Sequence, residues 1–600
     1  MRIDKYQFAL LLLLFVCNVL QASNNLKNHP SPYLAMHGDD PVQWRDWGEA
    51  AVKEARESGK LLYLSSGYFS CHWCHVMQRE SYQNSEIAEL LNKWFVPVKV
   101  DRELQPALDA YLISFVEKTE GHAGWPLNVF LTPDGYPVVG MTYVPAEQFQ
   151  ALLSKLHLLW VQEPQRLRDV ALSIHKQMQQ LSSVSQAETL PDGEKLLQQA
   201  VKSALAVGDD LQGGFGRINH FPMAPQLRLL LEAQRLFPSQ QLESFLRLTL
   251  NQMAIKGLRD HLAGGFFRYT VDPGWETPHY EKMLYTQAQL VSLYLRAASL
   301  LKEPRYEEVA SDTLDFVLQH MRESDGAYIA SLSAVDAQGN EGGSYLWREQ
   351  QLKELLSEEE LKLARQHWLF TFGEQLPGQA LPHAGALIES IAKAEGESPQ
   401  QLSRKVERIR SKLMNQRSTR EAPRDSKQLA AWNGLMLTAF SEAAAQLNRD
   451  DYRKAAAELA GWLTTLWDGE QLLRSTQEGR AVGTASLADY AYAAQGLKSW
   501  AQVSGDSGML KLSEQMTAVA WQRFFTHNGW RLGEKLLIPG LKGKPLLSDG
   551  PMPAPSAVLM GLSDSSKQQM EQALKMSAEK VSENPFWNAG HLWQLYLAQK

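Results

Sequence analysis

The chain of 600 residues is too long for one ordinary domain, and a prior of about 150 residues per domain predicts two to four units. Its 60 basic and 67 acidic residues give a net charge of −7, which excludes the basic excess of a typical nucleic-acid-binding protein. Hydrophobic residues make up 44% and charged residues 21%, which excludes global disorder, and three cysteines are too few for a disulfide-stapled scaffold.

Residues 1–22 are typical of a secretory signal peptide. Arg2 and Lys5 supply a positive start, and an apolar run from Ala9 to Val19 follows that is too short for a comfortable membrane span. Cleavage would remove Cys17 and leave no segment able to cross a membrane. We therefore expect an exported protein, periplasmic or extracellular, with an uncleaved anchor as the alternative.

Residues 23–180 alternate between strand and helix patterns and are predicted to form one domain. Short apolar runs typical of buried strands alternate with amphipathic stretches. Strands are expected at 61–66, 95–100, 127–132 and 136–142, and helices at 48–58, 85–94, 106–120 and 147–159. This order of elements is that of an α/β thioredoxin fold.

Cys71 and Cys74 follow the first strand and open the next helix, the position that a thioredoxin fold gives to its redox pair. Helix amides and the helix dipole would stabilise a thiolate at Cys71, and Cys74, about one turn later, could resolve a mixed disulfide. Pro126 directly precedes the third strand, where thioredoxins carry a cis-proline beside the disulfide. We therefore expect a cis bond between Trp125 and Pro126.

His72 and His75 lie next to the cysteines, and we interpret them as charges that tune the thiol pKa, with surface-exposed histidines as the alternative. The pentapeptide from Cys71 to His75 also matches the attachment signature of c-type haem, and its two cysteines and two histidines could act as zinc ligands. The strand before it and the proline and strand after it argue against haem, and neighbours on one turn rarely supply four tetrahedral zinc ligands. We predict no metal and no cofactor beyond the Cys71–Cys74 disulfide, with a purely structural disulfide as the alternative.

A polar connector at 181–193 precedes a region, 194–600, in which strand patterns nearly vanish. The turn signals Asp325-Gly326, Asp468-Gly469 and Asn528-Gly529 each precede a short possible β element. Paired helices with glycine-rich loops predict an all-α, six-hairpin (α/α)6 toroid, with an open solenoid as the alternative. Helices are expected at 226–237, 241–262, 281–301, 306–321, 429–447, 452–467, 487–503 and 507–525.

Two segments of this region have the residue types of a ligand site: the loop 260–282, and Trp432-Asn433-Gly434 at the start of a predicted helix. The loop 260–282 combines acids, bases, aromatic rings and glycines, and could bind hydroxyl groups, stack on a ring and, through Glu276 or His279, move protons. The possible carbohydrate-funnel residues are Asp260, His261, Asp272, Glu276, His279, Glu281, Trp432 and Asn433. Loop packing and helix capping are the alternative, because no spacing here fixes a pair of carboxylates.

Motifs along most of the chain resemble those of the spermatogenesis-associated protein 20-like family. The resemblance is carried by Ser31-Pro32-Tyr33-Leu34, Pro41-Val42-Gln43-Trp44, Cys71 to Met77, Val98 to Glu103, Gly124 to Gly135, Pro278 to Tyr285 and Trp432 to Met436. It implies a thioredoxin-like domain followed by a toroid similar to those of N-acylglucosamine 2-epimerases and six-hairpin glycosidases. In that comparison Cys71 and Cys74 match the redox pair and Pro126 the facing proline, but the resemblance implies no particular reaction.

The predicted toroid departs from the family pattern at three polar positions. Ser333-Ala334-Val335 stands where the family tends to have Asp-Ala-Asp, Pro553 to Ala557 where it has Pro-Ser-Gly-Asn-Ser, and Asp425-Ser426-Lys427 where it has Asp-Asp-Lys. These losses weaken a catalytic role for the toroid, whereas the redox motif is intact.

We expect an exported thiol–disulfide oxidoreductase whose partner is a protein thiol or disulfide, joined to a toroid that binds carbohydrate or positions the partner. One alternative is a carbohydrate-active, epimerase- or glycosidase-like barrel with an accessory redox domain. The other is a non-enzymatic binding scaffold. No nucleic-acid partner is expected.

Overall fold

A computed structural model of the chain describes residues 24–181, 186–370, 378–477, 479–533, 537, 548–562 and 567–600. The expected signal peptide at 1–22 and residues 182–185 of the expected linker lie outside the described residues. The chain divides into two compact units. The first runs to Tyr68 and from Trp73 to Met178, and the second takes in Phe69–His72 and nearly all of the chain from Gln179 onward.

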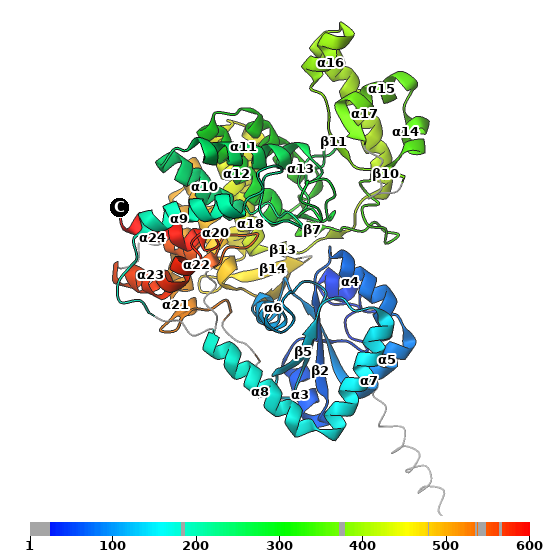
Figure 1. Ribbon diagram of the computed structural model, residues 1–600, viewed down its shortest axis with the longest axis vertical. Helices are drawn as coiled ribbons and strands as arrows, with labels where there is room; N and C mark the ends of the chain where they lie inside the picture. Colours follow the sequence, from blue (N-terminus) through cyan, green and yellow to red (C-terminus); the bar gives the residue numbers. More distant parts are fainter. Residues whose placement is uncertain are drawn as a thin grey trace, which may run out of the picture. The chain divides into compact units, whose positions relative to one another are not determined.

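The first unit is built on a five-stranded sheet in the order β1-β3-β2-β4-β5 (Figure 1). β1, β3 and β2 are parallel, whereas β4 runs antiparallel to β2 and β5 antiparallel to β4. The strands are β1 (Arg45–Asp46), β2 (Leu61–Gly67), β3 (Phe95–Asp101), β4 (Leu127–Leu131) and β5 (Pro137–Met141). Four of them match the predicted strands to within about a residue, so the predicted thioredoxin-like order is confirmed.

Helices cover both faces of this sheet, which is why β2 and β3 are buried along their whole length and are mainly apolar. α6 packs on β4 and β5, on the other side of the sheet from α5 and α7, which contact each other (Figure 1). The helical segments are α2 (Pro32–Ala35), α3 (Glu49–Ser58), α4 (His72–Met77), the π-helical turn η1 (Gln78–Tyr82), α5 (Ser85–Trp94), α6 (Pro106–Glu120), α7 (Ala146–Gln162) and α8 (Pro164–Leu181).

In the second unit, six of the described helices form an inner ring. Each contacts the next in the order α10-α12-α18-α20-α22-α24, and α24 contacts α10, so the ring closes. The inner helices are α10 (Ala224–Leu236), α12 (Leu284–Leu301), α18 (Ala430–Gln446), α20 (Leu487–Ser504), α22 (Pro555–Leu562) and α24 (Ala589–Ala598). Closure confirms the toroid and excludes the open solenoid.

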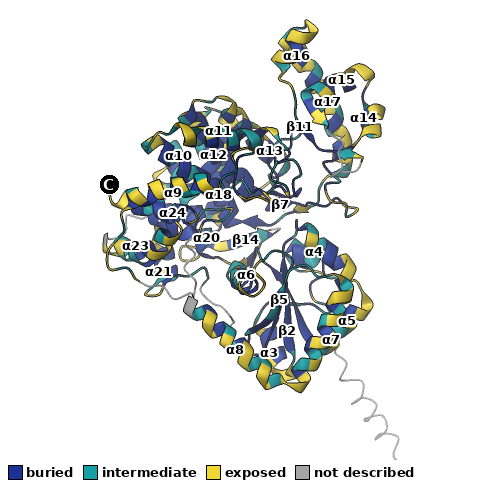
Figure 2. Ribbon diagram, in the orientation of Figure 1, coloured by how far each residue is buried: buried dark blue, intermediate teal, exposed yellow. Residues whose placement is uncertain are grey.

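Each inner helix is paired with an outer helix that comes before it in the sequence. The outer helices are α9 (Gly193–Val207), α11 (Gln240–Ile255), α13 (Arg305–His320), α19 (Asp450–Thr465), α21 (Ser507–Phe524) and α23 (Lys567–Glu583). α12 and α18 are buried nearly all round, whereas α11 exposes one polar face (Figure 2). α19 also exposes one polar face, as expected for a two-layered ring.

A helical insertion that the sequence analysis did not foresee separates α13 from α18. It contains α14 (Glu349–Leu355), α15 (Glu358–His367), α16 (Ile388–Glu395), α17 (Pro399–Arg417) and the 3₁₀ turn η2 (Ser418–Arg420). The insertion has a hydrophobic cluster of its own, which includes Trp347, Trp368 and Ile409. Leu262 of the ring joins this cluster and anchors the insertion to the loop after α11.

Short strands link the helices of the second unit, and β elements follow the three turn signals as predicted. They are β6 (Lys282–Met283), β7 (Ser331–Leu332), β8 (Trp347–Arg348), β9 (Trp368–Phe370), β10 (Gln379–Ala380), β11 (Pro382–Ala384), β12 (Arg424–Asp425), β13 (Gln428–Leu429), β14 (Leu473–Gln477), β15 (Arg480–Thr484), β16 (Phe525–Thr526) and β17 (Gly529–Trp530). No described helix combines the length and apolar character that a membrane span requires.

Candidate functional site

The two cysteines are joined in a disulfide directly after the central strand of the first unit. β2 ends at Gly67, and α4 begins at His72, so Cys71 immediately precedes the first turn of a helix. Cys71 is 3% exposed and Cys74 is fully buried. A helix start of this kind favours negative charge on the sulfur of Cys71 through the helix dipole.

Pro126 lies at the same edge of the sheet as the end of β2. Leu127 pairs with Ser66 across the antiparallel β2–β4 ladder, which brings Pro126 level with Gly67. The peptide bond between Trp125 and Pro126 is cis, as predicted.

Gly67 is required at the end of β2 because the backbone is closely approached there. A Cβ added to Gly67 would lie 2.7 Å from the Sγ of Cys74 and closer still to the hydroxyl oxygen of Tyr33. Both contacts are shorter than real Cβ atoms make. Glycine therefore leaves room for a sulfur and a phenol side by side.

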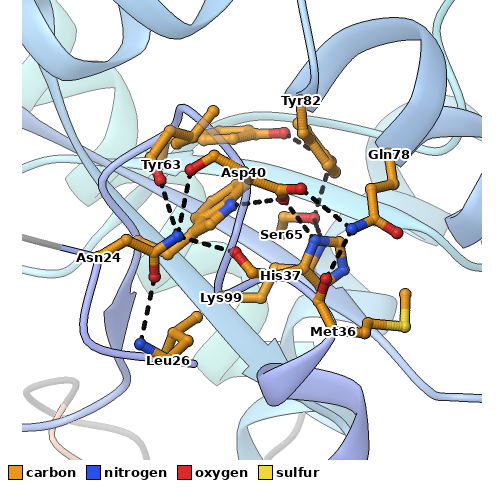
Figure 3. A network of polar contacts seen from close by, with 12 residues as sticks. Asn24, Leu26, Met36, His37, Asp40, Tyr63, Ser65, Gln78, Tyr82 and Lys99 are labelled. Carbon is orange, nitrogen blue, oxygen red and sulfur yellow. Dashed lines mark hydrogen bonds and ion pairs between the residues drawn. The ribbon is translucent and has the colours of Figure 1, made fainter. Parts of the chain in front are cut away.

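Beside this strand end, a lysine is held inside a cage of aromatic rings. The Nζ of Lys99 lies 4.4, 5.1 and 5.3 Å from the ring centroids of Tyr82, Trp44 and Tyr33. It also donates to Ser65 Oγ over 3.0 Å (Figure 3 labels Lys99, Ser65 and Tyr82). Lys99 is completely buried, and this burial lowers its pKa to about 7. The cage stabilises the ammonium through the ring faces, while burial favours the neutral amine.

A buried carboxylate fixes the helix that carries the cysteines to the amino-terminal loop. Asp40 accepts from Trp44 Nε1 over 3.0 Å, from Gln78 Nε2 over 3.0 Å, and pairs with His37 Nδ1 at 2.7 Å (Figure 3). Burial alone would raise the pKa of Asp40, but these hydrogen bonds lower it. Burial also lowers the pKa of His37 to about 4. Because Gln78 directly follows α4, this network sets the position of that helix.

Within the second unit, the segment Phe69–His72 is held by contacts of Ser70 and His72. Ala334 N donates to the Ser70 carbonyl over 3.2 Å, and Ser70 Oγ lies 3.3 Å from the Sδ of Met283. His72 Nε2 lies 3.5 Å from an oxygen of Glu341. A tuning role for His72 and His75 stays a prediction, but His72 has a carboxylate within reach.

An acid cluster surrounds His279. Its Nδ1 lies 3.7 Å from carboxylate oxygens of both Glu281 and Glu341, and its ring stacks on Tyr269. Burial and then the charge of Arg268 lower the pKa of His279 to about 4. Partial burial and the charge of Glu281 raise the pKa of Glu341 to about 7. One carboxyl of this cluster is therefore able to carry a proton at neutral pH.

Asp260 belongs to a different cluster, which is buried and structural in character. It accepts from Lys282 Nζ over 2.7 Å and from both terminal nitrogens of Arg417 over 3.0 and 2.6 Å. Burial alone would raise the pKa of Asp260, but Arg417 and Lys282 hold it well below its usual range. A carboxylate held by two cations is not placed to move protons.

The remaining acidic and histidine candidates of the loop also have partners. Glu276 pairs with Lys256 and with His383 Nδ1 at 3.1 Å, and the hydrogen bond from His383, with help from Lys256, lowers the pKa of Glu276 to about 2. Asp272 accepts from the amide of Glu276 over 3.1 Å and so closes a turn. The Nε2 of His261 lies 3.0 Å from the Lys256 carbonyl.

Trp432 and Asn433 occupy the start of α18. The Trp432 ring packs edge-on against Tyr285 at 4.9 Å. Asn433 accepts from the Tyr328 amide over 2.9 Å and donates to the carbonyls of Tyr328 and Leu429 over 3.0 and 3.1 Å. Asn433 therefore joins two backbone segments, whereas Trp432 belongs to an aromatic pair.

Several residues of these sites were not foreseen, because their contacts join distant segments. Lys99, Arg268 and Glu341 lie in or beside apolar or glycine-rich runs, and Arg417 ends a helix rich in charged residues. Lys99 alone had a signal, since it interrupts an otherwise apolar strand. Among the described residues, no three His, Cys, Asp or Glu side chains gather closely enough to share a metal ion.

A disulfide after the central strand of a thioredoxin-like unit, joined to an (α/α)6 toroid, defines the class of this protein. A family model described as "Protein of unknown function, DUF255", with the short name Thioredox_DsbH, matches residues 23–179. Spermatogenesis-associated protein 20 of Homo sapiens is 32% identical over 558 residues, which cover 84% of this chain and 70% of that protein. The Rattus norvegicus protein is 31% identical over 560 residues, covering 85% and 71%. The chain belongs to the spermatogenesis-associated protein 20 family.

Solved structures are similar to this chain at low identity. A crystal structure of D-mannose isomerase is 10% identical, covers 68% of this chain and 99% of its own, and has a TM-score of 0.43. Cellobiose 2-epimerase from Spirochaeta thermophila is 13% identical, covers 65% and 97%, and has a TM-score of 0.29.

Proposed function

We propose that this protein is an exported thiol–disulfide oxidoreductase. The observation that carries the proposal is the Cys71–Cys74 disulfide, which directly follows a buried central strand and begins a helix, level with Pro126 at the same sheet edge. The helix start favours a thiolate at Cys71, and the buried Cys74 is one turn away. A purely structural disulfide would not need its first sulfur at a helix start.

The reaction is a two-electron exchange. In the reduced protein the thiolate of Cys71 attacks one sulfur of a partner disulfide, which releases the other partner sulfur as a thiolate that takes up a proton. The thiolate of Cys74 then attacks Cys71 Sγ, forms the internal disulfide and releases the second partner thiol. The partner disulfide is reduced by two electrons and the cysteine pair is oxidised by two. The reverse sequence oxidises a partner dithiol.

Export is proposed on the residues that precede the described chain. Arg2, Lys5 and the apolar run that follows support a signal peptide. After cleavage the chain would keep one pair of cysteines separated by two residues, and a disulfide between them suits an oxidising compartment. The proposed partner is an extended protein segment, because Cys71 is only 3% exposed. A compact folded disulfide would not reach that sulfur without local opening.

Trapping experiments test this function. A Cys74→Ser variant should accumulate a mixed disulfide with a disulfide-bonded peptide, because Cys71 attacks but nothing resolves the adduct. A Cys71→Ser variant should form none, and it is the matched control in an assay of peptide disulfide reduction by glutathione. Mass spectrometry reads the adduct directly. A wild-type rate no higher than that of Cys71→Ser would refute the proposal.

A second candidate function, carbohydrate binding by the toroid, rests on the cluster around His279. Glu281 and Glu341 flank this histidine, and the stacked rings of Tyr269 and Phe221, 4.4 Å apart, lie beside it. Carboxyl groups beside an aromatic face are the groups that bind sugar hydroxyls and ring faces. A glycan-binding screen with wild type and Glu341→Gln tests it, and no binding to any glycan would leave the toroid as a scaffold for the redox unit.

A further inference from the structure

The end of β2 brings the hydroxyl group of Tyr33 next to the sulfur of Cys74. Both atoms crowd the same point, where a side chain on Gly67 would begin. That point is 2.7 Å from the Sγ of Cys74 and nearer to the oxygen of Tyr33. The two groups are therefore neighbours, although they come from segments far apart in the sequence.

The Tyr33 hydroxyl has no hydrogen-bond partner among the described residues. Both Tyr33 and Cys74 are completely buried, so bulk water does not supply one. A buried donor without a partner is costly, and such groups are rare in folded proteins. The position of this donor next to a redox sulfur allows its partner to form in another redox state.

The position of Tyr33 is fixed from several sides. Ser31 caps α2 by accepting from the Leu34 amide over 3.2 Å, and its hydroxyl donates to Asp101 at the end of β3 over 2.6 Å. The ring packs edge-on against His37 at 5.3 Å. Burial raises the pKa of Tyr33 well above its usual range, so the phenol keeps its proton and remains a donor. The Tyr33 hydroxyl is therefore held as a proton donor beside the cysteine.

We propose that the Tyr33 hydroxyl donates a hydrogen bond to the sulfur of Cys74 when the disulfide is opened, and that Tyr33 thereby stabilises the reduced protein. In the disulfide, Cys74 Sγ is a neutral and weak acceptor. Reduction adds two electrons to the Cys71–Cys74 bond and leaves Cys74 as a thiolate, which is a strong acceptor for the Tyr33 hydroxyl. Tyr33 is a positioning residue that acts through Cys74, and this inference rests on the proposed function only in treating the pair as a redox couple.

Equilibration with glutathione redox buffers tests this assignment. Tyr33→Phe keeps the ring and removes only the oxygen. We expect the equilibrium between the disulfide and the dithiol to move about tenfold toward the disulfide, which is about 30 mV toward a more negative reduction potential. Alkylation of free thiols followed by mass spectrometry reads the ratio.

The matched control is Tyr328→Phe. Tyr328 is another completely buried tyrosine whose hydroxyl has no partner among the described residues, but it lies in the second unit. Its replacement should leave the potential unchanged. Equal potentials in wild type and a folded Tyr33→Phe variant would overturn the inference.

A second measurement needs no variant. Infrared difference spectra of the full chain with carbon-13 at the tyrosine Cζ, reduced minus oxidised, should show one shifted C–O stretch as the Tyr33 hydroxyl gains its partner. No tyrosine band in the difference spectrum would also overturn the inference. Neither readout requires turnover, so a protein with a shifted potential but no exchange with peptides would refute the proposed function and keep the role of Tyr33.

Discussion

Replacing Lys99 with methionine should stabilise the first unit at neutral pH. Burial lowers the pKa of Lys99 from 10.5 to about 7. One pKa unit corresponds to about 1.36 kcal/mol, so the proton that the unfolded chain binds and the folded unit does not costs roughly 4–5 kcal/mol of stability at pH 7. Methionine fills a similar volume without a charge, and Ser65 keeps its 2.8 Å hydrogen bond with Tyr82.

The pH dependence gives the sign of the effect. Between about pH 7 and 10.5 the unfolded chain binds more protons at this residue than the folded chain, so the stability of the wild type rises with pH over this range. The cost of burying Lys99 is therefore absent above pH 10.5 and grows as the pH falls toward 7. The advantage of Lys99→Met should therefore shrink by about 2–3 kcal/mol when the pH rises from 7 to 9.

The assay is urea denaturation of wild type and variant at both pH values. Hydrogen exchange of peptides from β2 and β3, followed by mass spectrometry, reports the first unit separately from the second. Other titrating groups contribute equally to both proteins and cancel in the difference. Parallel pH profiles, or a variant that is less stable at pH 7, would refute the reasoning.

Two further predictions concern the second unit. Asp260→Asn leaves the charges of Lys282 and Arg417 buried without a counter-ion, and it should lower the unfolding free energy of this unit by about 3–5 kcal/mol in urea denaturation. The pKa of Glu341 is raised to about 7 by burial and by Glu281, so its contribution to stability is present at low pH and is lost as the pH rises through 7. Glu341→Gln should therefore raise the melting temperature relative to wild type more at pH 8 than at pH 5.

The prediction for Asp260 has a control in an exposed ion pair. Asp451 pairs with Arg449 at the surface, and its side chain is 50% exposed. Asp451→Asn should change stability by less than about 1 kcal/mol. A decrease in unfolding free energy for Asp260→Asn no larger than this would show that the buried cluster does not stabilise the ring. A melting-temperature difference between Glu341→Gln and wild type that is the same at pH 5 and pH 8 would contradict the raised pKa of Glu341.

Most of the first unit could be predicted because its signals are local. The runs 61–66 and 95–100 are apolar on both faces, which is the pattern of strands covered by helices, and the cysteine pair lies between them. The aromatic cage could not be predicted, because Tyr33, Trp44 and Tyr82 meet around Lys99 only after the chain has folded. The only sequence signal for the cage was a lysine, Lys99, inside a mainly apolar strand.

The second unit was predictable for a different reason. Its inner helices are apolar around most of their circumference, so α12 and α18 stand out in the sequence. The insertion was missed because α17 is rich in charged and polar residues and has only a thin apolar stripe. In the acid cluster, Glu341 comes from a glycine-rich loop far along the chain from His279, and no spacing rule connects the two.

The helical insertion leaves and rejoins the ring at two strands that are hydrogen-bonded to each other. Ser331 and Leu332 of β7 pair with Asp425 and Arg424 of β12, so the two ends of the insertion already lie side by side. Closing this gap with a short turn would cost little chain entropy. The ladder therefore joins both ends of the insertion to the ring, and a replacement module would also have to supply the positive charge that Arg417 places on Asp260.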